Sequence, residues 1–121
     1  MAASKNYRDL HVWQKGIAVV KEIYSLTEKF PKQEVYGLTS QIQRAAVSVP
    51  SNIAEGQARD SEREFHRFLR IALGSLAEID TQLELAKQLA YINVNESSTA
   101  NKLVLELRKM LYGLINSLGN K

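Results

Sequence analysis

The sequence of 121 residues contains no cysteine. This absence excludes disulfides, thiolate catalysis and cysteine-ligated zinc or iron–sulfur sites, and it fits a reducing compartment. No apolar run approaches the roughly 20 residues that a membrane-spanning helix needs, and the first residues, MAASKNYRDLH, lack the apolar centre of a signal peptide. We therefore expect a cytoplasmic protein that does not associate with membranes.

Proline and glycine are also scarce, with two and six copies respectively. No alternating run of β-branched residues stands out, so the sequence offers no support for strands. The chain is 45% hydrophobic and 24% charged, which is typical of a globular domain. Its length suits one domain with one modest core, and we expect residues 1–121 to form a single domain.

Apolar residues recur at helical spacing in four segments, at about 9–29, 34–57, 61–90 and 96–118, and residues 1–6 are expected to form a flexible N-terminus. Four such helices with short loops predict an all-α fold, an antiparallel up-down-up-down four-helix bundle. The predicted core positions, in chain order, are Leu10, Trp13, Ile17, Val20, Tyr24 and Thr27; Leu38, Ile42, Ala45, Val49 and Ile53; Phe65, Leu69, Ala72, Leu76, Ile79, Leu83, Ala86 and Ala90; and Leu103, Leu107, Met110 and Leu114.

Two helix starts have recognisable capping residues. Ser61 and Glu64 have the spacing of a capping box, in which each side chain satisfies a free backbone N–H of the other residue. Asn95 is the expected N-cap of the fourth helix, and Gly119 lies just beyond its end.

Three of the helices carry a second apolar edge beside the predicted core. A four-helix core needs about three positions in seven, so the surplus predicts an oligomer interface, although wide stripes also occur in monomeric bundles. The extra residues are Val12, Val19 and Leu26; Phe68, Leu85 and Leu89; and Val104, Leu111, Ile115 and Leu118.

The stretch RAAVSVPSNIAEG, residues 44–56, places Pro50 inside the second helix. An interior proline removes a backbone hydrogen bond and bends a helix, at a cost of about 3 kcal/mol. Ser48, Ser51 and Asn52 have short side chains that can bond to nearby backbone groups. We expect the helix to continue through a kink at Pro50. The same residues also allow two helices that meet at Val49 and Pro50.

Polar residues on the second helix face polar residues on the third in an antiparallel hairpin. Glu55 is expected near Arg63 or Arg67, Ser48 near Arg70, and Arg44 near Ser75 and Glu78. Together with Ser51 and Asn52 these residues form a predicted polar ladder that fixes the register of the two helices. The alternative is that Arg59, Arg63, Arg67 and Arg70 present guanidinium groups to phosphates, although Glu62 and Glu64 beside them weaken this interpretation.

The net charge of +3 is modest, and its distribution says more. Residues 1–32 hold six Lys/Arg against three Asp/Glu, and residues 92–121 hold four against two. These segments could form a positive surface, or they could simply be solvated helix faces, since both signs alternate along every helix. The candidate nucleic-acid contacts are Lys15, Lys21, Arg59, Arg63, Arg67, Lys102, Arg108 and Lys109.

Catalysis finds little support in the sequence. His11 and His66 are far apart, and each is expected to be a surface or interface residue. No Glu-x-x-His motif, P-loop or dinucleotide fingerprint occurs, and no base is placed near Ser48 or Ser51. We predict a protein that is not an enzyme, with no catalytic residue, cofactor or metal.

Two long segments resemble a known family. YGLTSQIQRAAVSVPSNIAEG, residues 36–56, and EFHRFLRIALGSLAEIDTQLELA, residues 64–86, are similar to the four-helix-bundle proteins encoded in intervening sequences of bacterial 23S rRNA genes, as is YRDLHVWQKG, residues 7–16. The resemblance implies a homopentameric ring. It also implies kinship with the accessory variability determinant of diversity-generating retroelements, a basic pentamer that binds nucleic acid and partners a reverse transcriptase.

Two functions follow from the resemblance. The first is an oligomer that binds RNA or DNA through its basic surface, although a net charge of +3 is low for such a binder. The second is a scaffold or accessory subunit that engages another protein, such as a reverse transcriptase, without touching nucleic acid. Reversing the charge of Arg63 and Arg67 distinguishes the two, provided that the fold survives.

Overall fold

The computed structural model describes residues 6–119, and within this range the chain is helical with no β-strand. Its elements are η1 (Tyr7–Asp9), α1 (His11–Thr27), η2 (Lys32–Glu34), α2 (Leu38–Ala58), α3 (Glu62–Gln88) and α4 (Val94–Ser117), where η marks a 3-10 helix. The predicted all-α fold with four long helices is confirmed. The predicted flexible N-terminus lies outside the described residues except for Asn6, whose side chain accepts a hydrogen bond from the backbone N–H of Arg8 at 2.9 Å.

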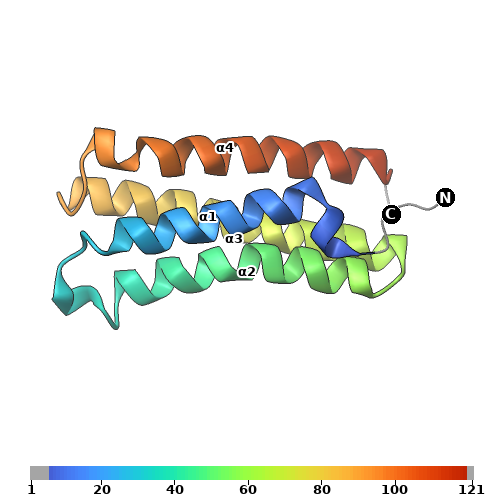
Figure 1. Cartoon of the computed structure of the whole chain (residues 1–121), viewed down its shortest axis with the longest axis horizontal. Helices are drawn as coiled ribbons and strands as arrows, with labels where there is room; N and C mark the ends of the chain where they lie inside the picture. The colour runs from blue at the N-terminus through green and yellow to red at the C-terminus, as the bar shows by residue number, and fades with distance from the viewer. Residues whose placement is uncertain (1–5, 120–121) are drawn as a thin grey trace.

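The four helices lie side by side, and each runs opposite to the one before it (Figure 1). α1 packs against α2 and α4, and α3 packs against the same two helices. The α1–α2 and α3–α4 turns share one end of the bundle, and the α2–α3 turn lies at the other end (Figure 1). Within residues 6–119 no helix has both the length and the apolar character that crossing a membrane requires.

Helices α2 and α3 bury the faces that their periodicity predicts. The fully buried side chains include Ile42, Val49 and Ile53 of α2 and Leu69, Leu76, Ile79 and Leu83 of α3. Leu38 and Phe65, near the starts of these helices, are only half-buried. Ala90 is exposed because α3 ends before it and its backbone takes a left-handed conformation with φ of 62°.

Helix α1 buries a face beside the predicted one: of the predicted core residues Thr27 is buried, and Leu10, Trp13 and Val20 are half-buried against the core. Val12, Val19 and Leu26, expected on a second edge, are in the core, whereas Ile17 is 36% exposed and Tyr24 is 45% exposed. The buried face contains Gly16, where an added Cβ would lie 3.3 Å from the Cβ of Pro50 in α2. The missing side chain therefore lets α1 approach α2 closely on this face, and that contact orients the helix.

Helix α4 also buries a different face from the predicted one. Val104, Leu111 and Ile115 are buried, and of the predicted core residues only Leu107 is fully buried. Leu103, Met110 and Leu114 are half-buried. Both faces of α4 are apolar enough to serve as core, so the packing of α4 against α1 and α3 decides which face is buried.

Helix α2 continues without interruption through Pro50, so the alternative of two separate helices is wrong. Pro50 is buried, and its ring lies against Gly16 of α1. The side-chain amide of Asn52 donates to the carbonyl oxygen of Ser48 at 2.8 Å, close to the position where the proline interrupts the backbone hydrogen bonds. The bend at Pro50 stays a prediction.

Helix α4 begins earlier than expected because its N-cap is Asn93, not Asn95. The side chain of Asn93 accepts from the backbone N–H of Glu96 at 2.8 Å, and the Glu96 carboxylate accepts from the backbone N–H of Asn93 at 2.9 Å. Only Asn93 has a glutamate three residues later, so only Asn93 can complete this capping box.

A side-chain clamp joins the α1–α2 turn to the α3–α4 turn, which lie at the same end of the bundle. One oxygen of Glu34 accepts from the backbone N–H of Leu38 at 2.8 Å, and its second oxygen accepts from the hydroxyl of Tyr91 at 2.7 Å. Helix α2 therefore starts at Leu38 rather than at the predicted residue 34, because Glu34 lies in η2 and caps α2 with its side chain.

Candidate functional site

Part of the predicted polar ladder lies where α2 packs against α3. The hydroxyls of Ser48 and Ser75 lie 2.8 Å apart, and the side-chain amide of Asn52 donates to Ser48 Oγ at 2.9 Å. Ser48 was predicted to lie near Arg70, and Arg44 was predicted to lie near Ser75. In the structure it is Ser48 that pairs with Ser75. The register is shifted by about one helical turn from the expected one.

The shift has a local cause at the α2–α3 turn. At Gly56 an added Cβ would lie 2.5 Å from the Cβ of Phe68, so the two helices touch closely at this point. Asp60 adopts φ of 56°, and the chain reverses between Ala58 and Glu62 in three residues. The tight turn and the glycine contact together fix which residues of α2 and α3 face each other.

The other ladder residues do not pair as predicted. Glu55 forms its ion pair with Arg59 at 2.9 Å, one turn along its own helix, and not with Arg63 or Arg67. It still lies near enough to Arg67, as predicted, for its charge to raise the pKa of that guanidinium group. The carboxylate of Glu78 accepts from the side-chain amide of Gln82 at 3.4 Å. Three further ladder residues, Ser51, Arg44 and Arg70, are exposed.

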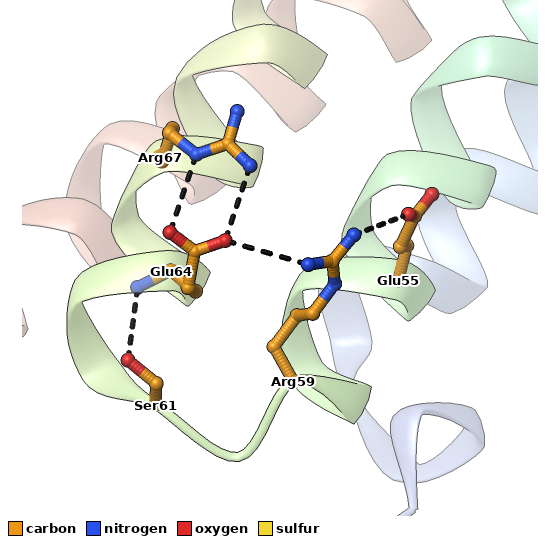
Figure 2. A network of polar contacts seen from close by, with 5 residues as sticks. All are labelled: Glu55, Arg59, Ser61, Glu64 and Arg67. Atoms are coloured by element: carbon orange, nitrogen blue, oxygen red, sulfur yellow. Dashed lines mark hydrogen bonds and ion pairs between the residues drawn. The ribbon is translucent and has the colours of Figure 1, made fainter.

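Four arginines gather where α2 turns into α3, and we call Arg59, Arg63, Arg67 and Arg70 the arginine cluster. Figure 2 shows Glu64 between two of them. Its carboxylate accepts from Arg67 Nη2 at 3.1 Å and from Arg67 Nε at 3.4 Å, and it lies 3.7 Å from Arg59 Nη1. The two guanidinium groups therefore share one carboxylate.

The guanidinium groups of the same two arginines also lie over the aromatic ring of Phe68. The guanidinium carbon of Arg59 lies 5.0 Å from the ring centroid and that of Arg67 lies 4.5 Å from it. Both distances fall within the ~6 Å range of cation–π attraction. Phe68 is buried, so the ring is a fixed platform under two partly exposed charges.

An open hollow on the outer face of α3 adjoins this network. Its lining residues are Arg63, Glu64, His66, Arg67, Arg70 and Ile71, which gives three guanidinium groups against one carboxylate. Among residues 6–119, Arg63 and Arg70 take part in no ion pair. Planar guanidinium groups in this arrangement suit the oxygen atoms of phosphate.

The electrostatics of the pair formed by Glu64 and Arg67 keep both partners charged at neutral pH. The hydrogen bond from Arg67 is the largest influence and lowers the pKa of the Glu64 carboxyl, burial opposes it, and the positive charges of Arg67, Arg59 and Arg63 lower the pKa further. The same hydrogen bond raises the pKa of Arg67, and the charges of Glu64 and Glu55 add to that rise.

The remaining predicted contacts lie elsewhere on the bundle. Lys15 of α1 binds Glu106 of α4 at 3.1 Å. Lys21 lies beside Leu103 in a shallow hollow between α1 and α4, away from the arginine cluster. Three exposed cations, Lys102, Arg108 and Lys109, belong to α4. The structure thus brings together only Arg59, Arg63 and Arg67 of the eight candidates.

Reasoning from sequence missed the roles of Gly56 and Phe68. Gly56 ends the SVPSNIAEG stretch, and a glycine within a helix is the signal that another element comes close. The two histidines lie apart, with His11 exposed at the start of α1 and His66 at the hollow. Within the described range, no group of three or more metal-ligating side chains is placed to hold an ion.

These features define an antiparallel four-helix bundle with a cluster of arginines at one turn. The sequence profile of the 23S rRNA-intervening sequence protein family matches residues 8–113, and the chain belongs to this family. A similar solved structure, from Bacteroides thetaiotaomicron, is described as a protein with unknown function from the S23 ribosomal protein family. It is 28% identical with a TM-score of 0.79, and the alignment covers 86% of this chain and 97% of that chain. No curated protein matches the sequence.

Proposed function

We propose that this chain is a non-enzymatic, homo-oligomeric protein that binds RNA or DNA through the arginine cluster. The observation that supports this most directly is the row of Arg63, Arg67 and Arg70 along one face of α3, at the edge of one open hollow. Phosphate oxygens are acceptors without donors, and guanidinium groups bind them in pairs of parallel hydrogen bonds. Contacts of this kind give affinity that depends on salt and little on base sequence.

Assembly would strengthen such binding. One chain carries a formal charge of +3, so a ring of five copies, the number implied by the family resemblance, would carry about +15 and several arginine clusters. The exposed apolar side chains of Ile17, Tyr24 and Val47 on α1 and α2 favour an interface between copies, since large apolar groups in water favour association.

The test is fluorescence anisotropy with labelled structured RNA and random duplex DNA, from low to physiological salt, with mass from light scattering on the same sample. The variant Arg63→Ala/Arg70→Ala removes two charges that make no ion pair among the described residues, so the fold should survive. We expect weaker binding and a shallower salt slope, by about 0.9 for each phosphate of duplex DNA that the variant no longer neutralises.

A matched control removes two exposed charges from α4, as Lys102→Ala/Lys109→Ala. It changes the net charge equally and leaves the arginine cluster intact. Loss of affinity in the control, with normal affinity in the Arg63/Arg70 variant, would move the site to α4. Equal affinity in both variants and the parent protein would contradict a role for either surface.

A second candidate function is a scaffold or accessory subunit, for example of a reverse transcriptase, that touches no nucleic acid. The exposed apolar residues Tyr24 and Val47, which border one hollow with Arg44, favour a protein partner on this face. A well-formed oligomer that binds neither RNA nor duplex DNA at low salt would support it. Both candidates place the protein in the cytoplasm, where such partners lie.

A further inference from the structure

Glu64 occupies the position at which a phosphate would be best held by the arginine cluster. Its two oxygens face the Nε and Nη2 atoms of Arg67 at 3.4 and 3.1 Å, the parallel arrangement in which arginine also binds phosphate. Its Oε1 additionally lies 3.7 Å from Arg59 (Figure 2). A carboxylate with these three contacts presents the same acceptor geometry as two oxygens of a phosphodiester.

We propose that Glu64 is a built-in competitor of nucleic-acid phosphate, and that a phosphate binds Arg59 and Arg67 by taking the place of the Glu64 carboxylate. This inference rests on the proposed function, because it concerns the same site. The exchange limits affinity there, because the chain must give up an internal ion pair for each external one that it gains.

The ion pair is placed so that it can exchange. The side chains of Glu64, Arg67 and Arg59 remain 33%, 55% and 47% exposed, so solvent reaches all three groups. Exposed pairs of this kind contribute little to stability. The backbone at the start of α3 does not depend on the carboxylate, since the hydroxyl of Ser61 accepts from the Glu64 N–H at 3.2 Å.

The two guanidinium groups have other supports that remain when Glu64 leaves. Both lie over the ring of Phe68, and Arg59 keeps its 2.9 Å contact with Glu55. Arg63 and Arg70 flank Arg67 on the same face and border the same hollow. A phosphate that displaces Glu64 at Arg67 therefore meets the guanidinium groups of Arg59, Arg63 and Arg70 nearby, and these offset part of the loss of the internal ion pair.

The experiment compares Glu64→Gln with Glu78→Gln in the full chain. Both changes remove one negative charge from α3, and Glu78 makes no ion pair among residues 6–119. The probe is a labelled single-stranded RNA of mixed sequence, titrated by anisotropy across a salt series. Light scattering and thermal unfolding on the same samples report assembly and stability.

We expect Glu64→Gln to bind the RNA about two- to fivefold more tightly than the parent chain, the range of an exposed ion pair. The slope of log K against log salt concentration should steepen by about 0.7, because one additional phosphate of a single strand is neutralised. Glu78→Gln should change affinity much less. Glu64→Ala, which removes the carboxylate and leaves no polar group in its place, should shift affinity in the same direction as Glu64→Gln.

Different outcomes separate this inference from the proposed function. If Arg63→Ala/Arg70→Ala weakens binding but Glu64→Gln and Glu64→Ala bind no better than Glu78→Gln, the competitor role is wrong and the nucleic-acid site stands. Weaker binding by both Glu64 variants would make Glu64 a structural support of the arginines and would also overturn the inference. If the parent chain binds no RNA at low salt, both fall together.

Discussion

The contact between Gly56 and Phe68 makes a prediction whose size can be worked out from the structure. In Gly56→Ala, the new Cβ would lie 2.5 Å from the Cβ of Phe68 and 3.3 Å from its Cγ. The nearest atom is attached directly to the α3 backbone, so no side-chain rotation can move it away and the helices must separate. Overpacking of this kind costs about 1–3 kcal/mol.

Part of this cost is offset because alanine favours a helix interior over glycine by about 1 kcal/mol. The net loss should be about 1–2 kcal/mol, toward the upper part of the range because the clash involves an atom next to the backbone. For a chain of this length, 1 kcal/mol corresponds to about 4 °C in Tm. We therefore expect Gly56→Ala to lower Tm by about 4–8 °C.

Circular dichroism melting at one fixed protein concentration measures the effect, since assembly would make Tm depend on concentration. Gly74→Ala is the matched control, because Gly74 lies in α3 and an added Cβ there meets no atom within 4 Å. It should raise Tm by about 4 °C through helix propensity alone. A Gly56→Ala variant as stable as Gly74→Ala would refute the assigned close contact.

Three further predictions concern a cap, a carboxylate and the proline. Asn93→Ala should cost about 1 kcal/mol of stability in urea unfolding, whereas Asn95→Ala should cost much less, because only Asn93 caps α4. The pKa of Glu34 is lowered first by the backbone N–H at the start of α2 and then by the hydroxyl of Tyr91. Its stabilisation is therefore present above its unfolded pKa of ~4.3 and is lost as pH falls through the lower folded value. Urea unfolding of Glu34→Gln should show a smaller loss of stability on acidification, and an unchanged acid dependence would argue against the clamp. Pro50→Ala should straighten α2 and weaken assembly more than folding, and a variant that keeps both its mass in light scattering and its curvature in a crystal structure would contradict this.

The helices themselves were predictable, but the faces of α1 and α4 were not. Periodicity identifies an apolar face only when the other faces are polar, and α1 carries Val19 and Leu26 on one side and Ile17 and Tyr24 on another. The deciding residue is Gly16, because it permits the approach of Pro50. A single glycine contributes almost nothing to a hydrophobic pattern, so the pattern could not identify which of the two apolar faces is buried.

The arginine cluster was predictable as a set of residues, while its internal contacts were not. Helical spacing places Arg63, Arg67 and Arg70 on one face of α3 whatever the rest of the fold does. The position of Arg59 and the pairing of Ser48 with Ser75 depend on the three-residue turn and on the contact at Gly56. Register between helices is a tertiary property, and a shift of one turn leaves the sequence pattern of each helix unchanged.

The clamp between Glu34 and Tyr91 has a consequence for the order of folding. The α2–α3 hairpin closes through a turn of three residues, whereas the Tyr91–Glu34 hydrogen bond joins residues 57 positions apart. Closing that longer loop costs more chain entropy, and the bond needs both outer turns to be in place. We therefore expect the clamp to form late in folding, so that losing it would speed the unfolding of the bundle and leave the folding rate almost unchanged.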